Sequence, residues 1–272
     1  GASIITGGVI KLQGHAQPII KNCIVTQNDI QWDAIWGHYS GVIFENCVFK
    51  DNQSDNIIKF EISNLTPSII NCTFTGNSGA SILTTISITN PPIIRSSIFY
   101  NNGVGNLSGI LDVNNCLVEG GYYGEGNIDS DPLFLDPIAN NYTLADFSPC
   151  IGGGTLTNAP VTDLIGNPRP NPAGSNPDMG AYENPYGTPQ HMPITINIPD
   201  DYATIQAGLN AADSTDTVLV QPGTYYENII WPETNGIKLL SAGDSSNTII
   251  DGGGSGSVIT INGSGLSIDS TT

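Results

Sequence analysis

The sequence predicts an all-β, right-handed parallel β-helix, with one short capping helix before a second β-helix segment. Three observations support this fold class: similar segments recur at a fixed interval, apolar residues alternate within each segment, and asparagines repeat at matching positions. An interval of about 25 residues is typical of stacked coils, in which each strand pairs with the coils above and below it.

The repeat is clearest in five segments that align on one small residue each. These residues are 24, 25, 25 and 19 positions apart: Cys23, Cys47, Cys72, Ser97 and Cys116. A second alternating segment precedes each of the five, so we expect two strands per coil. The preceding segments are VIKLQ (9–13), AIWGHY (34–39), IIKFEI (57–62), ILTTISI (82–88) and ILDV (110–113). Prolines suit the corners between the two strands, at Pro18, Pro67, Pro91 and Pro92.

Two asparagine columns and one cysteine column follow from the alignment. Because an amide both donates and accepts hydrogen bonds, stacked asparagines can continue a ladder along the axis while tolerating a left-handed turn. The first column is Asn22, Asn46, Asn71, Ser96 and Asn115, and the second is Asn28, Asn52, Asn77 and Asn102. The cysteines in register should point inward as small apolar residues, buried and mostly unpaired. No C-x-x-C pair is present, so the spacing does not indicate a zinc site.

The pattern divides the chain into four parts. Residues 1–126 are expected to form the C-terminal coils of one β-helix, and residues 127–183, rich in proline and glycine, its irregular cap or edge. Residues 184–197 are interpreted as a linker. Residues 198–272 should begin with a helix, N-capped by Asp200 or Asp201, that covers the first coils of a second β-helix; the last of its strands are SVITIN (257–262) and GLSID (265–269).

The chain resembles bacterial right-handed parallel β-helix repeat proteins, including surface proteins of the choice-of-anchor type. The phrases GNIDSDPLF, SPCIGGG, TDLIGNPRP and PDMGAYE resemble the C-terminal end of such domains, whereas IPDDYATIQAGLNAA and DTVLVQPGTYYENI resemble their N-terminal beginning. The ending phrases come first in this chain. If Thr272 is followed by Gly1 of another copy, strands and turns continue at coil spacing, which favours one period of a tandem array or filament; a fragment of a longer two-domain chain is the alternative.

Composition limits the partners. The chain has 25 acidic and 7 basic residues and a net charge of −18, so a nucleic acid backbone would be repelled. No apolar run reaches the roughly 20 residues that span a bilayer. The abundance of polar turns and short strands, together with the resemblance, favours a secreted or cell-surface protein.

No complete active site is predicted, and we assign no catalytic residue, cofactor or metal ligand. A polysaccharide lyase would need a base beside a calcium-binding acidic cluster. The basic residues within the repeats are interpreted as solvated outward residues: Lys11, Lys21, Lys50, Lys59 and Arg95. The carboxylate pairs Asp51 with Asp55 and Glu45 with Glu61 meet the requirement of a glycosidase only by chance.

The remaining candidates are weaker still. Calcium at Asp129, Asp131 and Asp136 is less favoured than hydrogen bonding within the cap. His15, His38 and His191 show no metal-binding spacing.

Two tryptophans offer a surface on which a sugar ring could stack. We expect Trp36 in the core and Trp32 exposed. The function predicted is therefore a non-catalytic extracellular structural or adhesive β-helix whose partners are its own copies, end to end, and possibly a polysaccharide. The alternative is a carbohydrate-active β-helix enzyme: a lyase, an esterase or a glycosidase.

Overall fold

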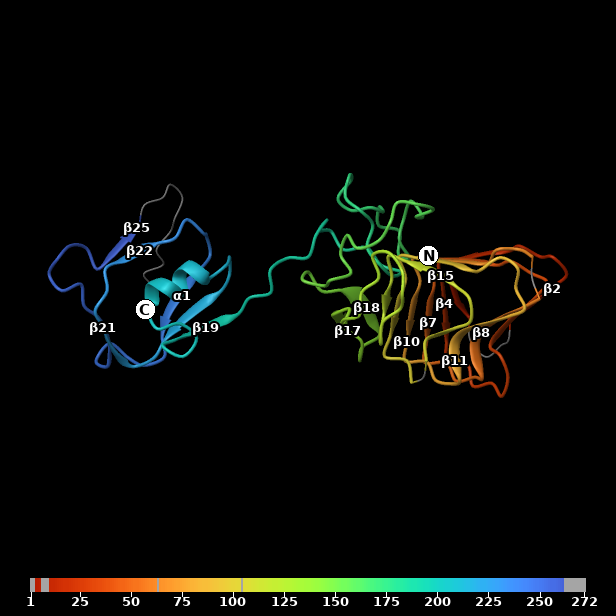
Figure 1. Ribbon diagram of the computed structural model, residues 1–272, viewed down its shortest axis with the longest axis horizontal. Helices are drawn as coiled ribbons and strands as arrows, with labels where there is room; N and C mark the ends of the chain where they lie inside the picture. The colour runs from red at the N-terminus through yellow and green to blue at the C-terminus, as the bar shows by residue number, and fades with distance from the viewer. Residues whose placement is uncertain (1–2, 6–9, 63, 104, 262–272) are drawn as a thin grey trace. The chain divides into compact units, whose positions relative to one another are not determined.

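The computed structural model describes residues 3–5, 10–62, 64–103 and 105–261, which fall into two compact units (Figure 1). Unit 1 comprises residues 1–190 and unit 2 residues 191–272. No helix in the described ranges is long and apolar enough to cross a membrane.

Unit 1 is a parallel β-solenoid with three sheets. Sheet A contains β1 (Ser3–Ile5), β4 (Cys23–Thr26), β7 (Val48–Lys50), β10 (Thr73–Thr75), β13 (Ile98–Tyr100) and β16 (Leu117–Val118). Sheet B contains β2 (Ile10–Gln13), β5 (Ile35–His38), β8 (Asn56–Glu61), β11 (Ser81–Ile86) and β14 (Leu107–Ser108). Sheet C contains β3 (Ile19–Lys21), β6 (Ile43–Glu45), β9 (Ser68–Ile70), β12 (Ile93–Arg95) and β15 (Asp112–Asn114). Every strand in these three sheets pairs in parallel with the coil before or after it, so the predicted stacking of coils is confirmed.

The prediction of two strands per coil was wrong, because each aligned segment breaks into two short strands. The break falls at the first asparagine column, where φ is 54° at Asn22, 50° at Asn46 and 50° at Asn71. A left-handed residue turns the chain sharply, so the strands on either side belong to sheets C and A. The segment ILDV (110–113) was also misassigned: β15 lies in sheet C, and β14 takes the expected place in sheet B.

The second asparagine column forms the predicted hydrogen-bonded ladder. The Nδ2 of Asn28 donates to Asn52 Oδ1 (2.7 Å), that of Asn52 to Asn77 Oδ1 (2.9 Å), and that of Asn77 to Asn102 Oδ1 (3.0 Å). The left-handed residue of this turn is not the asparagine but the residue before it, as at Gln27 (φ 58°). The ladder therefore holds the corner between sheets A and B in register along the axis.

The core of unit 1 contains a ring stack beside the thiol column. The rings of Phe49 and Phe74 are 4.5 Å apart and those of Phe74 and Phe99 are 4.7 Å apart, both nearly parallel. The cysteines are unpaired, as predicted; Cys47, Cys72 and Cys116 are buried and Cys23 is partly buried. Burial raises the pKa of the Cys116 thiol to about 12, so this thiol is unreactive at neutral pH.

The irregular segment at 127–183 was predicted as a cap or edge of the solenoid. Residues 120–128 close the last coil, where Ile128 N donates to Cys116 O (2.9 Å). The chain then continues through the antiparallel pair β17 (Phe134–Asp136) and β18 (Asn141–Leu144) and covers the outer face of sheet A. Val48 packs there against Leu164 and Ala181. We call residues 130–187 the flank segment.

Most side-chain hydrogen bonds of the first asparagine column are made with the flank segment. Asn46 Nδ2 donates to Thr162 O (2.6 Å) and Asn71 Nδ2 to Asp178 O (2.9 Å). The side chains of this column were expected to bond mainly to one another, but within the described residues only the Asn46–Asn22 pair does so (3.2 Å).

The predicted linker at 184–197 is shorter in the structure. Asn184 is buried and its Nδ2 donates to Leu144 O (3.1 Å), so it belongs to the flank segment. At the other end, Thr195 begins the first strand of unit 2.

Unit 2 starts with the predicted helix against short parallel sheets. The sheets are formed by β19 (Thr195–Ile198), β20 (Thr217–Val220) and β23 (Lys238–Ser241); β21 (Gly223–Tyr225) and β24 (Thr248–Ile250); and β22 (Ile229–Trp231) and β25 (Ile259–Ile261). Helix α1 (Ile205–Ala211) buries Ile205 and Leu209 among these strands. Gly208 permits the close approach, since a Cβ there would lie 2.7 Å from Ile198 Cδ1.

One prediction for unit 2 is wrong, and another falls outside the described residues. The N-cap is Thr204, whose side chain accepts from Ala207 N, and not Asp200 or Asp201. Asp201 instead accepts from Asn197 N (2.7 Å) in the preceding turn. The predicted strand at 265–269 lies outside the described residues.

We predict that Asn77→Ala lowers the free energy of unfolding by about 2–4 kcal/mol, because both the N–H and the Nδ2 of Asn52 lose their buried acceptor. Urea unfolding followed by circular dichroism measures this change. Ser78→Ala, at the exposed neighbouring position, is the control and should change stability by no more than about 0.5 kcal/mol. Equal midpoints for the two variants would contradict the structural role of the ladder.

Candidate functional site

The flank segment determines which faces of unit 1 are accessible to a ligand. It covers sheet A from outside, where Ile98 and Leu117 pack against Cys150, Ile151 and Met179. The outer face of sheet B carries polar and aromatic side chains instead. A ligand therefore has access to sheet B and to the corner between sheets A and B.

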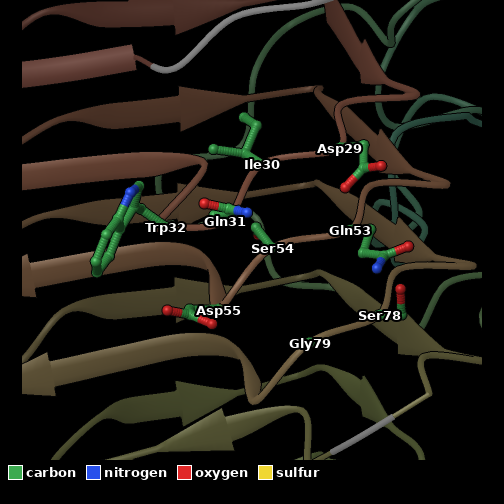
Figure 2. A pocket seen from close by; sticks show the side chains of 9 residues that line it. All are labelled: Asp29, Ile30, Gln31, Trp32, Gln53, Ser54, Asp55, Ser78 and Gly79. Atoms are coloured by element: carbon green, nitrogen blue, oxygen red, sulfur yellow. The ribbon is translucent and has the colours of Figure 1, made fainter.

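A groove lies at this corner, across three successive coils. Isolated bridges join Asp29 to Gln53 and Gln53 to Ser78, so equivalent turns stack in register. The cavity has a volume of about 570 Å³ and is lined by Asp29, Ile30, Gln31, Trp32, Gln53, Ser54, Asp55, Ser78 and Gly79, as Figure 2 shows. We call it the corner groove.

The corner groove combines one aromatic face with side-chain amides, hydroxyls and carboxylates. Trp32 is 73% exposed, as predicted, and Gln31, Gln53 and Asp55 are exposed near it. Exposing the apolar face of an indole to water is unfavourable, so a ligand that covers it gains free energy. The side-chain amides can donate hydrogen bonds to hydroxyl groups and accept hydrogen bonds from them. The arrangement can bind a sugar ring by stacking and orient it by hydrogen bonds.

Sequence reasoning identified Trp32 as a stacking surface and considered Asp55 only as half of a carboxylate pair; it missed the other lining residues. Three of the missed residues directly follow the second asparagine column: Asp29 follows Asn28, Gln53 follows Asn52 and Ser78 follows Asn77. That shared position was the available signal.

Trp36 was expected in the core and lies outside it. Burial alternates along β5, so that Ile35 and Gly37 face inward and Trp36 faces out. The ring of Phe60 fills the interior beside Gly37, where a Cβ would lie 2.8 Å from its Cδ1. Trp36 therefore lies on the outer face of sheet B, in register with Lys11 and Lys59.

These outer residues form a polar network beside the corner groove. Trp36 Nε1 donates to Glu61 Oε2 (2.9 Å), and Lys11 Nζ lies 4.9 Å from the centre of the Trp36 ring. Lys59 Nζ pairs with Glu61 Oε1 (2.8 Å) and with Asp33 Oδ2 (3.4 Å).

The lysine and arginine considered as lyase bases are both engaged, not solvated as expected. The hydrogen bond from Lys59 to Glu61 raises the pKa of Lys59 and lowers that of Glu61, which keeps the ammonium protonated. A base that abstracts a proton must be unprotonated at the operating pH. Arg95 Nη2 pairs with Asp112 Oδ2 (2.7 Å) on the neighbouring coil. The Lys59–Asp33 and Arg95–Asp112 ion pairs join neighbouring coils.

The members of each carboxylate pair weighed for glycoside hydrolysis have different surroundings. Glu45 is on β6 of sheet C and Glu61 on β8 of sheet B. Asp51 pairs with Lys50 (3.3 Å), whereas Asp55 lines the corner groove.

The acidic residues considered as calcium ligands accept hydrogen bonds from backbone N–H groups. Asp129 accepts from Gly120 N (3.1 Å), Asp131 from Leu133 N (2.8 Å) and Asp136 from Ala139 N (3.0 Å). In the described part of the chain, no three side chains of His, Cys, Asp or Glu gather closely enough to hold a metal ion.

The histidines are dispersed. His38 packs beside Trp36 (5.2 Å between ring centres) and Tyr39 (4.4 Å), and His15 stacks on Tyr39 (6.0 Å). His191, in unit 2, contacts Asp216 (Nε2 to Oδ1, 2.7 Å).

A buried charged cluster in the flank segment resembles an active site in composition but is closed to solvent. Arg169 Nε lies 3.0 Å from Glu183 Oε2, and both side chains are fully buried. Asp178 accepts from the backbone of Gly152 and Asn184, and Asp163 accepts from three successive backbone N–H groups, those of Ile165, Gly166 and Asn167. We interpret this cluster as the polar centre of the flank segment.

Comparison with known proteins agrees with the fold. Residues 3–132 match the model of the right-handed β-helix region family. Together with the parallel coils of unit 1, this match shows the right-handed parallel β-helix fold. No curated protein and no solved structure matched it.

We predict that the flank segment is more stable at pH 5 than at pH 8. Burial raises the pKa of Asp178 to about 6 and that of Glu183 to about 7, because three buried carboxylates share one guanidinium. Groups with a raised folded-state pKa contribute stability that is complete below about pH 4 and is lost as the pH rises through about 7. The expected loss is about 1–3 kcal/mol.

Hydrogen exchange of the amides at 163–184, corrected for intrinsic exchange, measures this change in the full chain. Asp178→Asn should reduce the pH dependence, and Asp129→Asn, in an exposed turn, should leave it unchanged. Protection that rises from pH 5 to pH 8 would contradict the prediction.

Proposed function

We propose that this protein is a non-catalytic structural and adhesive β-helix, secreted or at the cell surface and of the bacterial choice-of-anchor type, that binds polysaccharide in the corner groove. The carrying observation is Trp32, an indole 73% exposed beside amide and carboxylate side chains in a groove of about 570 Å³. The stiff solenoid and the paired state of Lys59 and Arg95 support a binding role over a catalytic one. The net charge of −18 argues against nucleic acid.

Trp32→Ala should weaken polysaccharide binding at least about tenfold, equivalent to about 1.4 kcal/mol, because the stacking surface is lost. Affinity electrophoresis in gels that contain a neutral glucan, a chitin derivative or pectate measures this. Tyr123→Ala is the matched control, since Tyr123 is 99% exposed on the same unit and does not line the groove.

Absence of binding to every glycan tested would contradict the proposal. Reproducible release of reducing or unsaturated ends, abolished by Lys59→Ala, would favour the alternative of a carbohydrate-active enzyme.

Self-association end to end is the second part of the proposal. Within the described residues, strands β1, β2 and β3 are each the terminal strand of their sheet. Such edges offer unpaired N–H and C=O groups to another chain, and a contact that does not close produces a fibre.

Electron microscopy of the purified chain at rising concentration should show threads whose axial repeat equals one chain. Isolated monomers at every concentration would contradict this part of the proposal and leave the carbohydrate-binding part standing.

A further inference from the structure

The corner groove contains two carboxylates, those of Asp29 and Asp55. The side chains of Asp29 and Asp55 line it, and neither has a hydrogen bond or an ion pair with another side chain among the described residues. Figure 2 shows them on either side of Gln31 and Ser54. A ligand with positive charges would therefore find free acceptors at both ends of the groove.

The described lining of the groove supplies no cation that could compete for these carboxylates. The nine lining residues include no lysine or arginine. On sheet B, Lys59 already forms ion pairs with Asp33 and Glu61. A net charge of −18 adds a negative potential that attracts cationic ligands and repels polyanions such as uronate polymers.

The aromatic and amide groups add the features that a sugar requires. The exposed face of Trp32 can stack on a pyranose ring and attract an ammonium group on that ring by a cation–π interaction. Gln31 and Gln53 can hydrogen-bond hydroxyl groups. A simple cation would use the carboxylates alone, whereas an amino sugar would use all three kinds of group.

We infer, on the basis of the proposed function, that the corner groove selects a glycan whose sugars carry ammonium groups, such as a glucosamine polymer. The carboxylates of Asp29 and Asp55 bind the ammonium groups and Trp32 binds a ring face. Neutral glycans of the same backbone bind by stacking and hydrogen bonds alone, and so more weakly.

The test compares glucosamine oligomers with N-acetylglucosamine oligomers of equal length, by calorimetry with the full chain at pH 6. The two share one backbone and differ at the 2-amino group, which is an ammonium in the first and a neutral acetamide in the second. The glucosamine oligomer should bind at least about tenfold more tightly, and its affinity should fall as salt is added. The double variant Asp29→Asn/Asp55→Asn should remove this preference and change the affinity for the N-acetylated oligomer by no more than about twofold.

Asp200→Asn/Glu233→Gln is the control, because it makes the same change in net charge at exposed positions in unit 2. It should keep the preference. Equal affinities for the two oligomers, or an equal loss in the control, would overturn the inference while polysaccharide binding remains. Oligolysine that binds as tightly as the glucosamine oligomer and is indifferent to Trp32→Ala would also overturn it. Failure of both oligomers and of all neutral glycans would instead reject the proposed function.

Discussion

Register between coils is the constraint on which the rest of unit 1 depends. The second asparagine column fixes it at one corner, since each buried Nδ2 donates to the next Oδ1 and each Oδ1 also accepts a backbone N–H, as from Asn52 N to Asn77 (3.1 Å). A slip of one residue would leave several buried amides unpaired, at a cost of about 1–3 kcal/mol each. Equivalent turns are thus repeated along the axis, which places Asp29, Gln53 and Ser78 in one line.

The flank segment decides which surface stays open. Apolar outer residues of sheet A, such as Val48 and Ile98, are buried because residues 130–187 fold back over them. The polar centre of that segment, around Arg169 and Glu183, costs free energy to bury and is balanced by backbone hydrogen bonds and by ion pairing. A covered sheet A and an open sheet B give the solenoid two different sides, and the corner groove lies at their border.

The charges of the open side differ in whether they are paired within the protein. Lys59 is held between Glu61 and Asp33, which aligns strands β5 and β8. In the corner groove, by contrast, the described lining that includes Asp29 and Asp55 contains no lysine or arginine, and Trp32 is exposed. The proposed adhesive function and the preference for amino sugars both rest on this difference between satisfied and unsatisfied groups.

The sequence by itself determined the parallel β-helix, the asparagine ladder, the unpaired thiol column and the exposure of Trp32, because each follows from a repeat or an alternation between near neighbours. It did not determine the third strand of each coil, since one left-handed residue such as Asn22 splits a continuous apolar segment and only backbone geometry shows the split. It also misplaced Trp36, because the inward side of β5 depends on the space left by Phe60 on the next coil.

Only the tertiary structure decided where the flank segment lies and which side chains line the corner groove. Contacts such as that of Val48 with Leu164 join residues more than a hundred positions apart, and no local pattern encodes such a distance.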